Sequence, residues 1–340
     1  MSKLMTKKAE LKQTTKQPNN STTETSIRDG FGRGLLKVAK LYPEIVALSA
    51  DLTESVRMQD FEKKYPEHFF QVGIAEQNMA GIAAGLALSG YIPFIGSFAC
   101  FQPYRNLDQM RTSICMMNAN VKIISSHAGL SYAADGIQVQ ALEDVGIMRM
   151  LPNMTVIVPA DAEQAEVLTQ EMVKLEGPVY LRLGREQASV LSARKVDSKA
   201  EKFPAIEIGK AQMIREGLDI TIIACGYMVA KALDAAMELS NQGISAQVIN
   251  LHTIKPLDTH TILTAAKKTG HVLTVEDHQA AGGMGSAVAE LLVQAKDDVK
   301  MKILGVGDQF GQTAKTSAEL WEAYGLTSKN IVNEAQKLLS

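Results

Sequence analysis

One glutamate and three aromatic side chains in this sequence could together bind a flat, nitrogen-bearing ring. Glu76 stands at the junction of an apolar run and a helical pattern rich in glycine and alanine. Phe98, Phe101 and Tyr104 follow it in the frame F-x-x-F-x-x-Y. A carboxyl group in apolar surroundings can hydrogen-bond a ring nitrogen, and aromatic side chains can stack on the face of that ring. The set therefore predicts a binding site for a heterocycle.

Each of these features alone has a simpler explanation. A glutamate at the start of a helix is commonly a solvated residue that favours the positive end of the helix dipole, and the aromatic frame is commonly part of a core. Their order and spacing together are more specific. After Glu76, one face of the predicted helix is apolar and carries Met79, Ile82, Ala83 and Leu86. Small residues elsewhere on this helix would let another subunit approach closely.

Composition limits the class of protein. The chain has 340 residues, enough for two domains, with 46% hydrophobic and 21% charged residues, as in globular α/β proteins. A net charge of −2 gives no indication of nucleic-acid or membrane partners. No apolar run reaches the roughly 18 residues of a transmembrane helix. The three cysteines, Cys100, Cys115 and Cys225, form no C-x-x-C frame, so we expect no disulfide framework and a cytoplasmic location.

The elements that must position these residues alternate along the chain. Apolar strand patterns occur near 45–50, 69–73, 92–96, 121–126, 155–159, 178–182, 219–225, 245–250, 271–276 and 302–305. Helical patterns occur near 27–41, 76–89, 101–118, 142–150, 161–174, 227–242, 259–268, 285–295 and 316–325. Apolar strands that alternate with helices are typical of parallel sheets covered on both faces. The sequence predicts two α/β domains with parallel sheets, at 26–185 and 208–340. The polar segment 186–207 would link them, and residues 1–25 would form a disordered tail.

The residues around Glu76 resemble the pyrimidine-binding domain of thiamine-diphosphate enzymes, and among these the transketolases. The segment LYPEIVALSADLTES (41–55) is similar to the S-A-D-L-T-x-S segment of that family. The resemblance implies that Glu76 is catalytic and that Asp51 lies at the subunit interface near the cofactor. Leu52 would prop the cofactor in its bent shape. Phe98, Phe101 and Tyr104 would be further cofactor contacts. Taken alone, Asp51 could simply cap a helix.

A second set of residues implies a phosphorylated substrate. Arg28, Ser55, His127 and Arg185 stand where transketolases contact the sugar phosphate. His127 directly follows a predicted strand, and ligands bind at the carboxyl ends of parallel strands. Guanidinium groups suit phosphate geometry. Taken alone, each arginine is more commonly a surface ion-pair partner and the histidine more commonly structural.

The segment after Asp135 departs from the family pattern. The resemblance implies that Asp135 contacts substrate hydroxyls. Transketolases usually read D-G-x-x-H-Q here, whereas this chain reads D-G-I-Q-V-Q, so Val139 replaces a histidine that contacts the reacting end of the sugar. We expect an altered donor preference, unless Gln138 or Gln140 supplies the missing hydrogen-bond donor.

The family's metal motif is absent from the sequence. Thiamine-diphosphate enzymes bind Mg²⁺ and the diphosphate through a G-D-G sequence, which this chain lacks. The resemblance covers 27–335 and corresponds to the second half of a full-length transketolase, its pyrimidine-binding and C-terminal domains. We therefore expect no metal site here. A separate N-terminal transketolase subunit would hold Mg²⁺ and the diphosphate, within a heterotetramer.

The segment VEDHQAAGGMGSAVAE (275–290) resembles a turn of the transketolase C-terminal domain, and it implies structural roles for Glu276 and His278. The sequence as a whole predicts the C-terminal subunit of a split transketolase, which moves a two-carbon ketol unit between sugar phosphates. Two alternatives stay open: the β subunit of a 2-oxo acid dehydrogenase, which shares this domain pair, and a non-catalytic interaction module.

Overall fold

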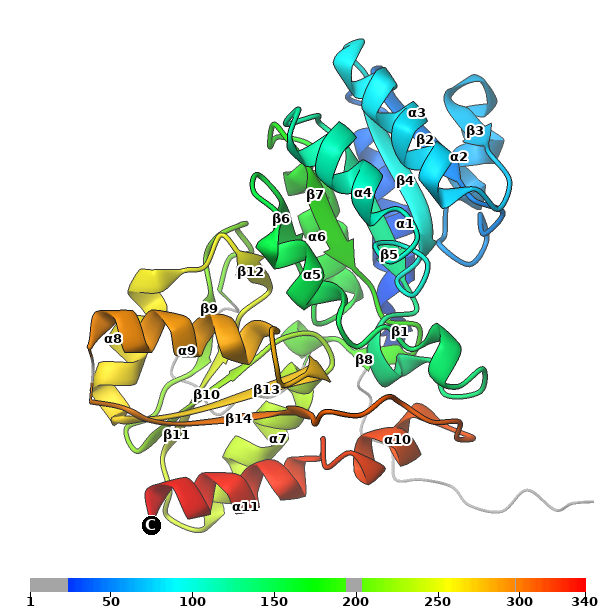
Figure 1. The fold of residues 1–340 in the computed structure, drawn as a ribbon. Helices are drawn as coiled ribbons and strands as arrows, with labels where there is room; N and C mark the ends of the chain where they lie inside the picture. The colour runs from blue at the N-terminus through cyan, green and yellow to red at the C-terminus, as the bar shows by residue number, and fades with distance from the viewer. Residues whose placement is uncertain (1–23, 194–203, 297) are drawn as a thin grey trace, which may run out of the picture.

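The computed structural model describes residues 24–193, 204–296 and 298–340, which form two α/β domains (Figure 1). The elements of the first domain are β1 (Glu24–Ser26), α1 (Ile27–Val38), β2 (Ile45–Ser49), α2 (Gln59–Lys64), η1 (Pro66–His68), β3 (Phe69–Gln71), α3 (Glu76–Leu88), β4 (Ile92–Phe98), α4 (Leu107–Gln109), η2 (Met110–Cys115), β5 (Lys122–Ser126), η3 (Gly129–Ser131), η4 (Ile137–Val139), α5 (Asp144–Met150), β6 (Thr155–Ile157), α6 (Ala162–Met172), β7 (Val179–Arg182), β8 (Gln187–Ser189) and η5 (Leu191–Ala193).

The second domain follows the same α/β alternation. Its elements are β9 (Gln212–Arg215), β10 (Ile220–Ala224), α7 (Met228–Asn241), β11 (Ala246–Asn250), β12 (Thr253–Lys255), α8 (Thr259–Thr269), β13 (His271–Gln279), α9 (Met284–Ala295), β14 (Lys300–Val306), α10 (Ser317–Ala323) and α11 (Ser328–Leu339). None of the helices in these described ranges is long and apolar enough to cross a membrane.

Both main sheets are mostly parallel, which confirms the predicted fold class. The seven-stranded sheet has the order β12-β6-β7-β5-β4-β2-β3, and the five-stranded sheet has the order β14-β13-β10-β11-β9. Only β12, against β6, and β9, against β11, run antiparallel in these sheets. Apolar side chains cover both faces, because α1, α6 and α7 contribute to one core cluster and α3, α5, α8 and α9 contribute to the other.

Several elements differ from the sequence expectations. Strands β9 and β12 and helices α2 and α11 were not predicted. Strand β1 lies partly inside the predicted tail and pairs with β8, which lies inside the predicted linker. The helix expected at 101–118 begins only at Leu107, after a series of turns that contains Pro103. The rest of the predicted tail and the centre of the predicted linker lie outside the described residues.

Helix α1 crosses α6 at very short range, and two glycines permit this crossing. A Cβ on Gly30 would lie 1.9 Å from the Ala162 carbonyl oxygen, and one on Gly34 would lie 2.7 Å from the Thr169 side chain. Larger residues would push the helices apart. The crossing fixes the first turn of α1, and with it Arg28.

The end of β13 holds the two domains together. The Asp277 carboxylate accepts a hydrogen bond from the Leu130 amide at 3.0 Å, and the Asp277 carbonyl accepts one from Arg182 at 2.9 Å. His278 Nε2 accepts a hydrogen bond from the Gly146 amide at 3.3 Å. The Glu276 carboxylate accepts hydrogen bonds from two amides at the start of α9. Asp277 and His278 therefore join the domains through hydrogen bonds between side chains and backbone groups, while Glu276 fixes the start of α9.

Candidate active site

The fold gathers the predicted site residues at the carboxyl edge of the seven-stranded sheet. Asp51 follows β2, Phe98 ends β4, His127 follows β5, and Arg185 comes shortly after β7. Glu76 begins α3, after β3. Because these strands are parallel neighbours in the sheet, their carboxyl ends open onto one region, where ligands bind in open α/β sheets.

The Glu76 carboxylate is buried, with 3% of the residue exposed, and two side chains donate hydrogen bonds to it. Ser97 Oγ lies 3.3 Å from its Oε1, and Arg105 Nη1 lies 3.2 Å from both of its oxygens. The Asn106 side chain donates to the Glu76 carbonyl oxygen at 3.3 Å. None of these three partners was predicted. Arg105 had a signal in the sequence, since it directly follows the aromatic frame.

Two of the three predicted aromatics form a stack beside Glu76. The rings of Phe98 and Phe101 have centroids 5.6 Å apart and planes 14° apart. Phe98 also stacks on His127, at 3.8 Å between centroids. Tyr104 points its hydroxyl at Glu143, to which it donates at 2.6 Å. Phe98 therefore connects the Glu76 region to the predicted phosphate region.

The four predicted phosphate contacts lie together around Arg28, which is 7% exposed. Arg28 donates to the Ser55 carbonyl at 2.8 Å and to the Arg185 carbonyl at 3.3 Å, and its Nη1 lies 3.4 Å from His127 Nε2. Arg28 thus connects three segments of the chain, which carry Ser55, His127 and Arg185. The Arg185 side chain is 43% exposed and forms an ion pair with Glu186, at 3.6 Å between Nη1 and Oε1. Its guanidinium lies over the Tyr132 ring, with the central carbon 4.7 Å from the ring centroid.

The electrostatics of this cluster favour an anion. Burial, and then the nearby Arg57 and Arg185, lower the pKa of Arg28 to about 10. Burial, and then the arginines around it, lower the pKa of His127 to about 2, so its imidazole is neutral near pH 7. Since positive charges crowd one another here, a bound phosphate or sulfonate group would relieve their repulsion.

Three residues at this edge adopt left-handed backbone conformations that side chains disfavour. The φ angles are +61° at Asp51, +65° at Arg57 and +60° at His127. Such conformations cost on the order of 1–3 kcal/mol each and concentrate at functional sites. Their grouping at the carboxyl ends of β2 and β5 supports a functional role for this edge.

The remaining predicted residues lie around the rim. Asp51 is exposed, and its amide donates to the Gln71 side chain at 2.8 Å. Leu52 is half-buried and packs against the core. Asp135 is exposed. Burial of Tyr132 raises the pKa of its hydroxyl, and the Asp135 carboxylate raises this pKa further. The structure therefore brings Asp135 to the phosphate cluster through Tyr132, which was not predicted, and leaves Asp51 at the edge.

Val139 is buried, and one of the two glutamines that could replace the donor of the missing histidine already makes other hydrogen bonds. The Gln140 side-chain amide donates to the Tyr132 carbonyl at 3.1 Å and to the Gln312 carbonyl at 3.0 Å. Both of its donor hydrogens are thus committed to backbone oxygens, so Gln140 has none left for a sugar. Gln138 is exposed.

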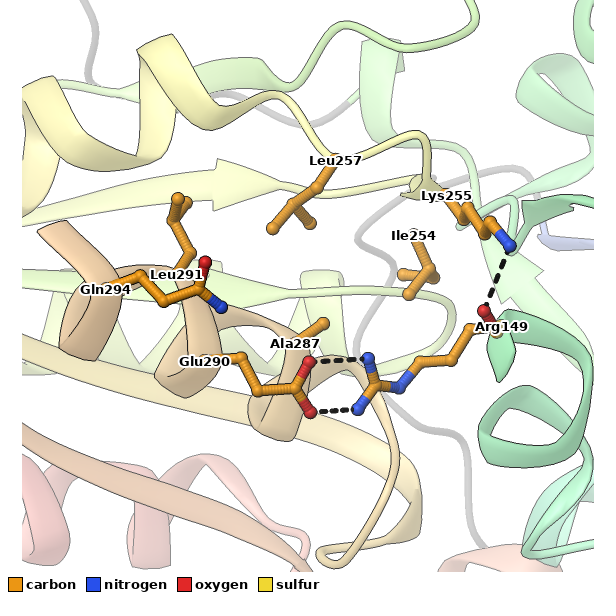
Figure 2. Close-up of a pocket in the computed structure, with 8 residues that line it drawn as sticks. All are labelled: Arg149, Ile254, Lys255, Leu257, Ala287, Glu290, Leu291 and Gln294. Atoms are coloured by element: carbon orange, nitrogen blue, oxygen red, sulfur yellow. Dashed lines mark hydrogen bonds and ion pairs between the residues drawn. The ribbon is translucent and has the colours of Figure 1, made fainter. Parts of the chain in front are cut away.

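A separate cavity of about 250 Å³ lies between the domains, and Glu76 is not among the residues that line it (Figure 2). Arg149 and Glu290 form a double ion pair across it, and the Lys255 ammonium donates to the carbonyl oxygen of Arg149 (Figure 2). The same ammonium donates to the carbonyl oxygen of Leu151. Because its charged groups satisfy one another, this cavity offers no group to a reaction. Within the described residues, no set of three or more histidine, cysteine or acidic side chains is arranged to hold a metal.

Comparison with known families agrees with this geometry. A family described as "Transketolase, pyrimidine binding domain" matches residues 23–189, and one described as "Transketolase, C-terminal domain" matches residues 209–331. These matches cover both domains. The chain belongs to the transketolase family, whose members depend on thiamine diphosphate.

Individual relatives are parts of split enzymes. The chain is 42% identical to the 6-deoxy-6-sulfo-D-fructose transketolase subunit SqwH of a Clostridium species, over 92% of this chain and 94% of that protein. It is 37% identical to one of the subunits of the apulose-4-phosphate transketolase of Phocaeicola vulgatus, over 91% and 96%. A solved structure described as "Split gene transketolase, inactive beta4 tetramer" superposes with a TM-score of 0.81, at 43% identity, over 92% and 98%. This chain is therefore a transketolase-type subunit.

The Glu76 region fits the pyrimidine half of thiamine diphosphate. A buried carboxylate can pair with a ring nitrogen, and the neighbouring rings of Phe98 and Phe101 offer aromatic surface. Glu76, Phe98 and Phe101 are the residues that would hold it.

Proposed function

We propose that this chain is the C-terminal subunit of a split transketolase, which transfers a two-carbon ketol unit between sugar phosphates. The observation that carries the proposal is the buried Glu76 carboxylate beside the stacked Phe98 and Phe101 rings. The names of its relatives support the same conclusion, because two of them are transketolase subunits of nearly the same length.

Glu76 is the proposed catalytic residue. Bound thiamine diphosphate would supply the carbon nucleophile for the transfer. Glu76 would share a proton with the pyrimidine nitrogen that faces its carboxylate, and Ser97 would orient that carboxylate through its hydroxyl. Phe98 and Phe101 would orient the ring and exclude water from the proton transfer.

The arginine cluster would bind the anionic end of the sugar. Arg185 offers a half-exposed guanidinium, while Arg28 fixes the segments that carry Ser55 and His127. Asp135 would contact substrate hydroxyls. The names of two relatives include a sulfo sugar and a sugar phosphate, both of which carry an anionic group. These observations support a substrate with an anionic end, and we propose that the substrates are ketose and aldose phosphates.

A separate N-terminal subunit would hold Mg²⁺ and the diphosphate. The sequence contains no G-D-G motif, which supports this division. Asp51 and Leu52, on the rim of the site, would meet that subunit and the cofactor. The complete enzyme would contain two copies of each chain.

Reconstitution tests this proposal. With thiamine diphosphate, Mg²⁺ and sugar phosphates, the chain alone should show no transketolase activity. Co-expression with a complementary diphosphate-binding subunit should give a hetero-oligomer that is active. The result that contradicts the proposal is normal turnover by this chain alone. Oxidation of a 2-oxo acid by the complex, in place of ketol transfer, would contradict it as well.

A further inference from the structure

We propose that Arg105 fills the pyrimidine position in the cofactor-free chain, and that the cofactor must displace it in order to bind. This inference rests on the proposed function of Glu76. It follows from one observation: a single planar, nitrogen-bearing side chain contacts both groups that would recognise the pyrimidine ring, namely the Glu76 carboxylate and the Phe101 ring.

The contact with Glu76 covers the open side of its carboxylate. Arg105 Nη1 is 3.2 Å from Oε1 and 3.2 Å from Oε2, so this nitrogen lies in front of the carboxylate, midway between the two oxygens. Ser97 already donates to Oε1, and the residue is only 3% exposed. A ring nitrogen that approaches this carboxylate therefore meets the Arg105 guanidinium.

The contact with Phe101 completes a stack of planar groups. His127 stacks on Phe98, Phe98 stacks on Phe101, and the central guanidinium carbon of Arg105 lies 4.0 Å from the Phe101 ring centroid. A guanidinium group and an aminopyrimidine share a planar shape and N–H donors, and both suit an aromatic face beside a carboxylate. Arg105 therefore stacks on Phe101 and forms an ion pair with Glu76 at the same time.

Arg105 can leave this position at small cost, whereas Glu76 cannot. The Arg105 side chain is 47% exposed, so its charge can return to water when the ring enters. The Glu76 side chain is 3% exposed, and a buried carboxylate that loses every partner is strongly destabilised. The exchange of guanidinium for pyrimidine keeps the carboxylate paired in both states. The apparent cofactor affinity is then the intrinsic affinity multiplied by the fraction of cofactor-free molecules in which Arg105 is already displaced.

Calorimetric titration of the reconstituted two-subunit complex with thiamine diphosphate and Mg²⁺ tests the displacement. Arg105→Ala should bind the cofactor about 3- to 10-fold more tightly than the wild type, because a half-exposed ion pair no longer competes. Arg111→Ala is the matched control, since Arg111 is exposed and its side chain contacts Met116. Its affinity should equal that of the wild type. Equal or weaker binding by Arg105→Ala overturns the inference.

Unfolding of the cofactor-free chain supplies a second test, which needs neither cofactor nor partner. Arg105→Ala should lower the unfolding midpoint by about 2–4 °C, because Glu76 loses its ionic partner. In a Glu76→Gln background the same substitution should have almost no effect. Equal effects in both backgrounds would overturn the inference. A wild-type complex that fails to bind thiamine diphosphate contradicts the proposed function instead. The unfolding experiment then still tests whether Arg105 pairs with Glu76 in the cofactor-free chain.

Discussion

Two buried glutamates, one in each domain, are held by different kinds of partner. Glu276 is 1% exposed and accepts hydrogen bonds from the backbone amides of Met284 and Gly285, at 2.7 and 2.8 Å. Glu76 is 3% exposed and accepts hydrogen bonds from the side chains of Ser97 and Arg105. Backbone amides at a helix start cannot move away, whereas side chains can. The first arrangement suits structure, and the second suits a group that must exchange partners during a reaction.

The largest effect should separate the two glutamates by their chemistry. In the reconstituted complex, Glu76→Gln should slow the proton exchange of the thiazolium carbon by about 10²–10⁴-fold, as expected for the loss of a positioned proton-transfer group. NMR measures this exchange directly. Glu276→Gln, once folded and assembled, should exchange at nearly the wild-type rate. Wild-type exchange in Glu76→Gln would show that both carboxylates are structural.

The next largest effect concerns stability, to which Glu276 should matter more than Glu76. Glu276→Ala should lower the free energy of unfolding of the chain by about 2–4 kcal/mol, because two buried amides lose their acceptor. Urea denaturation at neutral pH gives this value. Glu276→Gln is the conservative control and should lose less, since its amide retains one oxygen acceptor. A change below about 0.5 kcal/mol in Glu276→Ala would remove the structural assignment.

Two arginines repeat the contrast at the anion site. Arg185→Ala should raise KM for phosphorylated sugars by about 10–100-fold, because it removes the proposed charge-assisted bond to the phosphate. It should leave stability unchanged, because the Arg185 side chain is 43% exposed. Arg28→Ala should raise KM and also lower the unfolding midpoint, since Arg28 braces Ser55 and Arg185. Steady-state kinetics and thermal unfolding measure the two quantities. Equal loss on non-phosphorylated sugars would refute the anion assignment.

The smallest effect concerns acid stability. The folded-state pKa of His127 is lowered to about 2, below the value of about 6.5 in unfolded chains, so the unfolded chain binds the extra proton between these values. His127 therefore contributes stability above pH 6.5 that is lost as the pH falls below it. His127→Asn tolerates the left-handed backbone and should flatten this acid decline. Urea midpoints between pH 7 and 4.5 measure it, and parallel profiles for both proteins would contradict the prediction.

The parts of this fold that sequence predicts are those that local pattern determines. Apolar runs indicated β2, β4 and β5, and these strands then fixed where Phe98 and His127 lie. Strand β12 was missed because it is three residues long and its pairing with β6 depends on contact between the domains. Helix α11 was missed although its buried Ile331, Val332 and Ala335 follow a helical spacing.

In the site, too, some residues could be predicted from the sequence and others depend on the fold. Residue types and order indicated Glu76 and the aromatic pair, because the required chemistry restricts the residue types. Arg105 and Tyr132 were not predicted because an arginine or a tyrosine outside a helix or strand can have many roles. Their roles come from distances to Glu76 and His127 that only the fold creates.

Strand β12 has a consequence for anyone who cuts this chain at its domain boundary. A fragment that ends near residue 193 would keep β6 paired with β7 but would lose β12, which covers the other edge of β6. The exposed row of amide and carbonyl groups on β6 would then be free to recruit a strand from another molecule, which is a common route to aggregation. The second domain therefore protects an edge of the first domain's sheet. A truncated chain that retains Thr253–Lys255 should aggregate less than one that stops at the linker.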